Sequence, residues 1–214
     1  MSAILTKEEE QQIESAVKMA ESKISGEIVP VILQKSHHYP STKYKLALIA
    51  SVVMFLIIIA GDRLLSGFNL YDPIYYFSLS YGAAVLGFIA PVLFPSLAVS
   101  FASEKEKSHA VMQKAETIFL ESEVFNTKSR TGIMLFVSLA ERRALVMADT
   151  GINEKVDQST WDDLVGHLID NIKRNEMVTG ITDAIASASK ILLDNEFTVD
   201  ADDKNELPDN IITD

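Results

Sequence analysis

Two long apolar segments constrain this chain more than any other feature of its sequence. Residues 46–61 and 74–101 carry no charged side chain, whereas the flanking segments have the charge density of a soluble protein. The first segment forms a helix of roughly 24 Å, which flanking aromatic and basic residues extend toward a ~30 Å hydrocarbon core. The second is long enough to span with tilt. We therefore expect two transmembrane helices, at about residues 45–65 and 74–98.

Two buried core helices of a soluble protein are the alternative to this hairpin. A domain of this size cannot cover two segments that are apolar on every face, so the membrane interpretation is favoured. Pro91 and Pro95, near the end of the second segment, predict a kink or the point at which the chain leaves the hydrocarbon.

The lysines and arginines predict the orientation of the hairpin. The connecting loop carries only Arg63, whereas lysines flank both outer ends of the hairpin: Lys35, Lys43, Lys45, Lys105, Lys107 and Lys114. The positive-inside rule then places both termini in the cytoplasm.

Net charge and composition exclude several classes of protein. The formal net charge of -11 excludes nucleic acid as a partner, because a duplex needs a basic footprint. The absence of cysteine excludes disulfides, thiol nucleophiles and thiolate metal sites. The first ten residues, with Glu8, Glu9 and Glu10, do not have the pattern of a secretory signal.

The flanking segments predict one soluble domain that the hairpin interrupts. Thr6 and Glu9 form a capping box before an amphipathic helix. In the strand that follows, Pro30 indicates that the backbone nitrogen at this position faces a sheet edge or a bulge. The expected order is a helix at 7–22, a strand at 27–33, the membrane hairpin, a helix that ends near 120–121, strands at 132–139 and 144–148 with a turn at 140–143, and helical stripes at 161–172 and 178–192.

These elements define the expected domain organisation. Residues 1–43 and 102–198 form a discontinuous soluble domain, and residues 44–101 form the hairpin. Residues 199–214 are expected to be a flexible acidic tail.

Several short motifs in the soluble part carry a family resemblance. They are Ser25-Gly26-Glu27-Ile28, Val124-Phe125-Asn126-Thr127, Arg130-Thr131-Gly132-Ile133, Glu141-Arg142-Arg143, Ala148-Asp149-Thr150-Gly151-Ile152, Trp161, Gly180 with Ala184-Ile185, and Asn205-Glu206-Leu207-Pro208. In this order they resemble the TPM domain family, and more closely its bacterial membrane-protein branch.

The resemblance implies an α/β (α+β) sandwich with a small central sheet, here with an inserted two-helix transmembrane hairpin. It also implies an integral protein of the bacterial inner (plasma) membrane. Better known members are mostly lumenal or extracytoplasmic, and they include an acid phosphatase linked to photosystem repair and a modulator of ligand-gated channels. Some members bind calcium. This chain differs from them in having no secretory-signal pattern and in carrying the hairpin after its first strand.

Asp149 is the main candidate for a metal ligand. It follows a predicted strand, where a scaffold often places functional groups, and Glu154, Asp162 and Asp163 are the nearest additional oxygen ligands in the sequence. Such a site would hold calcium or magnesium. In the alternative interpretation Asp149 supports a turn, while Asp162 and Asp163 favour a helix N-terminus.

Arg130, Arg142 and Arg143 are the candidates for contact with a phosphate or an acidic headgroup. The alternative is a solvated hairpin tip whose arginines pair with nearby acids.

Two hypotheses about function follow. In the first, the hairpin holds the domain at the bilayer as an interaction, assembly or regulatory module for other membrane proteins. In the second, the chain is a divalent-metal-dependent phosphatase-like enzyme. The sequence shows no nucleophile paired with a base, which favours the first hypothesis and a non-enzymatic role.

Overall fold

The structure is a computed structural model that describes residues 4–64, 73–199, 206–208 and 210–213. The chain forms two compact units. The sheet unit comprises Met1–Ser36 and Ser108–Asp214, and the hairpin unit comprises His37–Lys107. The sequence places the corresponding boundaries at residues 43 and 102, so the structure assigns a few more residues on each side to the hairpin unit.

The sheet unit contains a small mixed sheet of four strands in the order β3-β2-β1-β4. β1 (Glu27–Leu33) pairs in parallel with β2 (Gly132–Ser138), and β2 pairs in antiparallel register with β3 (Arg143–Ala148). β1 and β2 are buried along their whole length, and both are rich in β-branched or large apolar residues.

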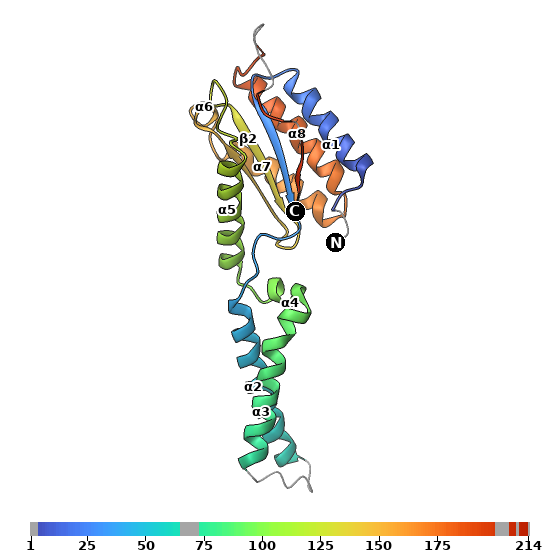
Figure 1. The fold of residues 1–214 in the computed structure, drawn as a ribbon, viewed down its shortest axis with the longest axis vertical. Coiled ribbons are helices and arrows are strands. Elements are labelled where there is room, and N and C mark those ends of the chain that lie inside the picture. Colours follow the sequence, from blue (N-terminus) through green and yellow to red (C-terminus); the bar gives the residue numbers. More distant parts are fainter. Residues whose placement is uncertain (1–3, 65–72, 200–205, 209, 214) are drawn as a thin grey trace. The chain divides into compact units, whose positions relative to one another are not determined.

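Helices cover both faces of this sheet (Figure 1). On one face, Ile28 and Ile133 pack in a core with residues of three helices, α1 (Lys7–Glu21), α7 (Thr160–Lys173) and α8 (Met177–Asp194). On the other face, Met134 and Phe136 pack against α5 (Glu104–Glu121). Successive strand residues therefore point into two different cores, as the period of two requires. The α/β sandwich with a small central sheet is confirmed.

The hairpin is inserted into the crossover between β1 and β2. Parallel strands need a crossover connection, usually a helix, because the chain must return to the starting edge of the sheet. Here α5 makes that return, and the hairpin unit precedes it in the sequence. The hairpin is therefore inserted in the β1–β2 connection, which has to leave the sheet even without an insertion, and the pairing of β1 with β2 is kept.

A local sequence signal sets the start of α1. The Thr6 side chain accepts a hydrogen bond from Glu9 N at 3.3 Å, and Thr6 N donates to the Glu9 carboxylate at 2.7 Å. This is the predicted capping box, and it confirms the start of the first helix.

Side-chain and tail contacts cover the outer edge of β1. The backbone groups of Ile28, Pro30 and Ile32 point away from β2, because Glu27 N donates toward the β2 side and directions alternate along a strand. Ile28 N donates to the Glu21 carboxylate at 2.9 Å, and Pro30 has no N–H. The nitrogen of Pro30 therefore lies on the side of β1 that faces away from β2, as predicted. Because Pro30 offers no N–H there, a strand of another molecule is less able to pair with β1 on that side.

The end of the chain supplies the remaining cover for this edge. β4 (Ile212–Thr213) pairs in parallel with Val31 and Ile32. The described part of the predicted flexible tail therefore contains an edge strand, which is a correction. Two apolar or β-branched residues in an acidic segment gave too weak a local signal, and the pairing depends on β1, which is far away in the sequence. Residues 200–205 of the predicted tail lie outside the described residues.

The hairpin unit contains two long apolar helices, α2 (Ser41–Leu64) and α3 (Pro73–Leu93), that pack against each other. Both are long and apolar enough to cross a membrane. A Cβ on Gly87 would lie 2.6 Å from the carbonyl oxygen of Leu46 and 2.9 Å from Cβ of Ala50, so only glycine allows this close approach. Edge-to-face ring pairs, such as Tyr44 with Phe88 at 5.5 Å, add to the contact.

The second apolar segment does not form one helix to residue 98 as predicted. α3 ends at Leu93, and a separate short helix, α4 (Pro95–Ser100), follows a non-helical Phe94. The ring of Pro95 disfavours helical backbone at the residue before it and removes an N–H, which explains the break. Pro91 is accommodated inside α3.

A polar clasp closes the open end of the hairpin unit. The Glu106 carboxylate accepts hydrogen bonds from Ser41 Oγ at 2.9 Å and Lys45 Nζ at 2.6 Å. It also accepts from Ser103 N at 2.8 Å and Ser103 Oγ at 2.9 Å, as the N3 residue of a capping box. Lys45 first, and then these donors, lower the pKa of Glu106 from 4.5 to about 2.

Candidate functional site

The loop of residues 124–131, between α5 and β2, packs closely against the ends of the strands. A Cβ on Gly132 would lie 1.9 Å from the carbonyl oxygen of Val124, and one on Gly151 would lie 2.3 Å from that of Ser129. Both distances are far below contact distance, so these positions need glycine. The motif glycines therefore allow one loop to lie against the start of β2 and the segment after β3.

Hydrogen bonds fix this loop in place. Glu27 N donates to Thr131 O at 3.2 Å, and Gly151 N donates to Arg130 O at 3.0 Å. Within the loop, Thr131 N donates to Thr127 Oγ1 at 2.8 Å. These bonds reach the start of β1 and the start of α6 (Thr150–Asn153). Together with the start of β2 and the loop itself, four segments therefore meet at one end of the sheet. In Figure 1 this end of the sheet lies beside α6.

Arg130 and Asp149 form a two-point ion pair at this edge. Arg130 Nε lies 2.8 Å from Asp149 Oδ2, and Arg130 Nη2 donates to Asp149 Oδ1 at 3.0 Å. The Asp149 side chain is 4% exposed, whereas that of Arg130 is 49% exposed. The Arg130 guanidinium also lies over the ring of Phe125, 5.3 Å from its centroid. A buried carboxylate and an aromatic ring thus hold a half-exposed cation in one orientation.

Asp149 also begins a helix. Its carboxylate accepts from Thr150 N at 2.7 Å and caps the N-terminus of α6. The predicted turn-supporting role of Asp149 is therefore present in the structure.

Two further acidic residues connect the end of the chain to the same edge. Glu206 N donates to the buried Glu27 carboxylate at 2.9 Å, and the Glu206 carboxylate accepts from Lys128 N at 2.8 Å. Two groups of side chains therefore lie at this end of the sheet, and we name them together the motif edge: Phe125, Arg130 and Asp149 in one group, and Glu27 and Glu206 in the other. They come from parts of the sequence up to 179 positions apart.

Comparison with known proteins identifies the domain. Residues 93–191 match the family model of the TPM domain. This part of the chain is similar to the TPM domain family. The matched range begins at the end of α3, so α1 and β1 lie outside it although they complete the sheet unit.

The TPM fold extends beyond that range. The NMR structure of the BA42 protein from the psychrophilic bacterium Bizionia argentinensis has the same fold, with a TM-score of 0.61 and 20% sequence identity. The alignment covers 100% of this chain and 98% of BA42. The comparison with curated proteins gave no match. The predicted family resemblance is confirmed.

The residues predicted as metal ligands do not lie together as a set. Glu154 is the exposed C-cap residue of α6, and Asp162 and Asp163 are exposed in the first turn of α7. Among the residues that the structure describes, no three His, Asp or Glu side chains form a group that could hold a metal ion. A hard cation needs several converging oxygens, and in this arrangement the Asp149 carboxylate is engaged by Arg130. The calcium or magnesium site stays a prediction.

The three predicted anion-binding arginines lie at two different ends of the sheet. Arg130 precedes β2, whereas Arg142 lies in the turn that follows β2 and Arg143 is the first residue of β3. The intervening strand of seven residues is about 23 Å long. In that turn Glu141 is buried and accepts from Ser36 N at 3.2 Å and from Ser138 Oγ.

Three residues of the motif edge were not among the predicted site residues: Glu27, Phe125 and Glu206. All three lie inside the motifs that carry the family resemblance. Their convergence could not be read from spacing, because the segments that hold them are distant in the sequence and meet only through the sheet and the loop of residues 124–131.

Proposed function

We propose that this chain is a membrane-anchored TPM domain that acts as an interaction module for other membrane proteins. In this proposal the hairpin lies in the bilayer, and the motif edge contacts an acidic group on the partner. α2 and α3 support the anchoring role because their large apolar side chains are exposed, for example Phe77 at 69% and Leu86 at 71%.

The orientation of the Arg130 guanidinium is the observation that carries the interaction proposal. Its Nε and one Nη face Asp149, and half of the side chain remains exposed. A guanidinium has five N–H donors in a fixed fork, so its outer edge can still donate to a carboxylate. Because Asp149 and Phe125 already restrict its rotamers, binding an acidic group would lose little side-chain entropy.

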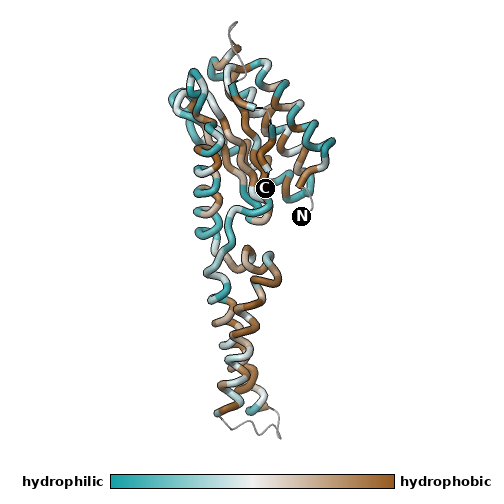
Figure 2. Tube along the Cα trace, in the orientation of Figure 1, coloured by the Kyte–Doolittle hydropathy of each residue, from teal (hydrophilic) through white to brown (hydrophobic). Residues whose placement is uncertain are grey.

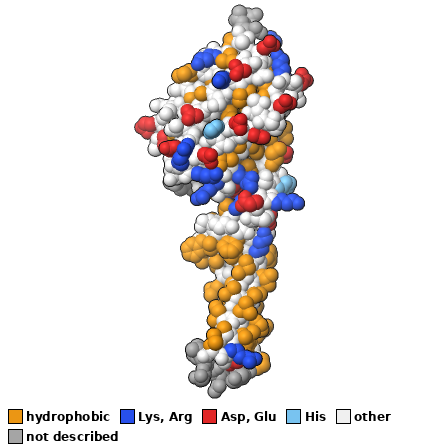
Figure 3. Space-filling view, turned by 180° about the vertical axis from the view of Figure 1, so that it is seen from behind, with side chains coloured by type: hydrophobic (Ala, Val, Ile, Leu, Met, Phe, Trp, Pro, Cys, Tyr) orange, Lys and Arg blue, Asp and Glu red, His pale blue; other side chains and the backbone are white. Residues whose placement is uncertain are grey.

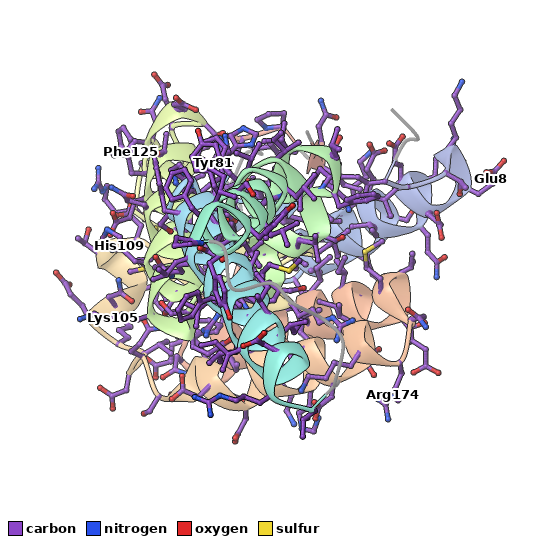
Figure 4. The ribbon with its side chains drawn as sticks, turned by 90° about the horizontal axis from the view of Figure 1, so that it is seen from below. Glu8, Tyr81, Lys105, His109, Phe125 and Arg174 are labelled. Atoms are coloured by element: carbon purple, nitrogen blue, oxygen red, sulfur yellow. The ribbon has the colours of Figure 1, made fainter. Side chains whose placement is uncertain are left out.

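Site-specific photo-crosslinking in cells that express the full chain tests this proposal. The photoreactive residue replaces exposed Ser129, next to Arg130, or exposed Glu8 on α1 as a control. Figure 4 shows that the labelled Phe125 and Glu8 lie on opposite sides of the sheet unit. We expect adducts with membrane proteins from position 129, and a large loss of them when Arg130→Gln is added.

The matched control is Arg142→Gln, which removes the same charge from an exposed residue at the other end of β2. It should leave the adducts unchanged. The proposal is wrong if position 129 gives no more adducts than position 8, or if both arginine variants reduce them equally. Arg130→Lys keeps the charge without the fork and should show an intermediate loss.

The proposed location is the inner membrane, with both termini in the cytoplasm. This orientation is supported by the lysines at both outer ends of the hairpin. Reporter fusions at the N-terminus and after Asp214 should both indicate the cytoplasm. A reporter within residues 66–71, which lie outside the described residues, should indicate the other side of the membrane. An external C-terminus would overturn this orientation.

A further inference from the structure

The break at Phe94 separates a short helix from the second long apolar helix. Phe94 has φ -124° and ψ 85°, outside the helical region, and Pro95 begins α4. Leu97 N donates to Phe94 O at 2.9 Å, so α4 starts directly after the break. In Figure 1, α4 is a separate coil that does not continue the axis of α3. The chain therefore changes direction at the end of its second apolar helix.

The exposed side chains of this segment are divided by polarity. At 100° per residue, Leu97 and the C-cap Phe101 point within about 40° of each other, Ser96 and Ser100 also point within about 40° of each other, and the mean directions of the two pairs differ by about 100°. Phe94 is 60% exposed and Phe101 is 42% exposed, and both serines are exposed as well.

On the remaining side of α4, Ala98 and Val99 are buried. Packing of these two residues fixes the rotation of the short helix. The two aromatic rings and the serines therefore keep their separate directions. Figure 3 shows hydrophobic side chains gathered at this end of the hairpin.

α4 connects two groups that need different surroundings. On one side it follows α3, whose last residues Val92 and Leu93 are 56% and 67% exposed and suit hydrocarbon. On the other side it is followed by Ser103 and the clasp of Glu106 and Lys45, whose side chains are 35% and 41% exposed. Charged groups with this exposure need water or lipid headgroups. The segment between them spans the transition from hydrocarbon to water.

From this juxtaposition we propose that α4 is an interfacial helix that lies in the plane of the membrane. Phe94, Leu97 and Phe101 enter the boundary between headgroups and acyl chains, and Ser96 and Ser100 face headgroups and water. The occupant of this apolar face is lipid, because exposed apolar residues follow one another from the end of α3, at Val92 and Leu93, to Phe94 before α4. This inference rests on the proposed insertion of the hairpin into a bilayer, and it adds an anchor that sets the depth of α3.

Spin-label accessibility in liposomes tests this proposal. The chain has no cysteine, so single cysteines can be introduced at positions 94, 96, 100 and 101 without removing any other. Each full-length variant carries a nitroxide label and is reconstituted into phosphatidylcholine–phosphatidylglycerol vesicles. Collision with oxygen, which enters the membrane, is compared with collision with a water-soluble nickel chelate. Labels at 94 and 101 should favour oxygen, and labels at 96 and 100 should favour nickel.

Two reference positions separate failure of this proposal from failure of membrane insertion. Leu86→Cys lies in α3 at a highly exposed apolar position, and Glu116→Cys lies on the exposed side of α5. If the label at 86 is as accessible to nickel as that at 116, the hairpin is not inserted and the proposed function also fails. If only the labels at 94 and 101 behave like 116, α4 does not contact lipid.

Two further outcomes would overturn the interfacial helix. If all four labels are as protected as the label at 86, the segment continues across the hydrocarbon as part of a longer span. If protection at 94 and 101 disappears when the protein-to-lipid ratio is lowered, a second copy of the chain covers this face instead of lipid. The expected pattern is independent of that ratio, since lipid is always in excess.

Discussion

The two units use the same apolar residue types in opposite ways. All seven residues of β1 are buried, whereas in α2 only Thr42 and Ile58 are buried. Figure 2 shows this contrast as hydrophobic strands between partly hydrophilic helices in one unit, and as long hydrophobic helices in the other. In the sheet unit, protein removes the apolar surface from water. In the hairpin unit most of that apolar surface stays exposed, so the two units should respond differently to the same substitution.

The largest expected effect is truncation of a buried ring in the sheet unit. Phe136 is fully buried between β2 and α5, and Phe136→Ala should lower the free energy of unfolding by about 3–5 kcal/mol. Phe77→Ala removes the same side chain from an exposed position in α3 and should change it by less than about 0.5 kcal/mol. Fluorescence of buried Trp161, the single tryptophan, follows unfolding of the sheet unit in detergent. Equal losses from the two substitutions would break the comparison.

Glycine substitutions should show the next largest difference. Gly132→Ala places a Cβ against the backbone of Val124, which cannot move aside without shifting the loop, and should cost about 1–3 kcal/mol or more. Gly82→Ala meets nothing within 4 Å and favours the helix, so it should not destabilise α3. Thermal melting of both variants in one detergent gives the comparison. A neutral Gly132→Ala would show that the loop of residues 124–131 is not held as tightly as described.

The buried carboxylate of the motif edge gives a third test, with an effect of intermediate size. Asp149→Ala removes a helix cap and the partner of Arg130, and the cap alone is worth about 0.5–2 kcal/mol. The predicted metal site near Asp149 makes a second prediction for this variant, on the calcium dependence of its melting temperature. Millimolar calcium should raise the melting temperature of the wild type, and Asp149→Ala should remove that rise.

The ion pair sharpens this calcium test. Calcium at Asp149 would compete with the Arg130 guanidinium, so Arg130→Gln should increase the calcium-dependent rise. Asp162→Asn, an exposed residue of α7, should leave that rise unchanged if only the Asp149 carboxylate binds calcium directly. The measurement uses about 0.15 M monovalent salt to screen diffuse attraction to the acidic chain. If calcium shifts Asp149→Ala as much as the wild type, the metal site near Asp149 does not exist.

The exposed clasp of the hairpin unit should show the smallest effect. Glu106→Gln should cost no more than about 1 kcal/mol, because exposed ion pairs contribute little. The folded pKa lies below the ordinary value, so this stabilisation is present above about pH 4.5 and is lost as the pH falls through about 2. An NMR titration of the Glu106 carboxyl should show this low pKa, and Lys45→Met should raise it. An unchanged pKa in Lys45→Met would show that Lys45 is not the main cause.

Features with local causes could be predicted from the sequence. The start of α1 follows from Thr6 and Glu9, which are three residues apart and act on the same helical turn. The two strands at β2 and β3 follow from short apolar runs on either side of a charged turn. Pro91 and Pro95 predicted a kink or the exit from the hydrocarbon, but the predicted span ran to residue 98, so the end of α3 at Leu93 and the short helix after it were not predicted.

The candidate site was predicted only in part, because its geometry depends on pairing between distant segments. Asp149 and Arg130 were both singled out, but for different partners, and the structure joins them to each other. Arg130 and Arg142 were grouped by residue type, although a strand separates them. Glu206 reaches Glu27 only because the end of the chain returns to the sheet.

The sequence alone therefore determined the long apolar helices, the order of most strands and helices, and the family motifs. These features depend on composition and on contacts within a few residues. Only the tertiary structure decided that Arg130 is held by Asp149, that β4 covers β1, and that α4 leaves the axis of α3. Residue spacing along the chain does not specify which distant backbones will hydrogen-bond, because that choice is made by the sheet register and by the packing of whole elements.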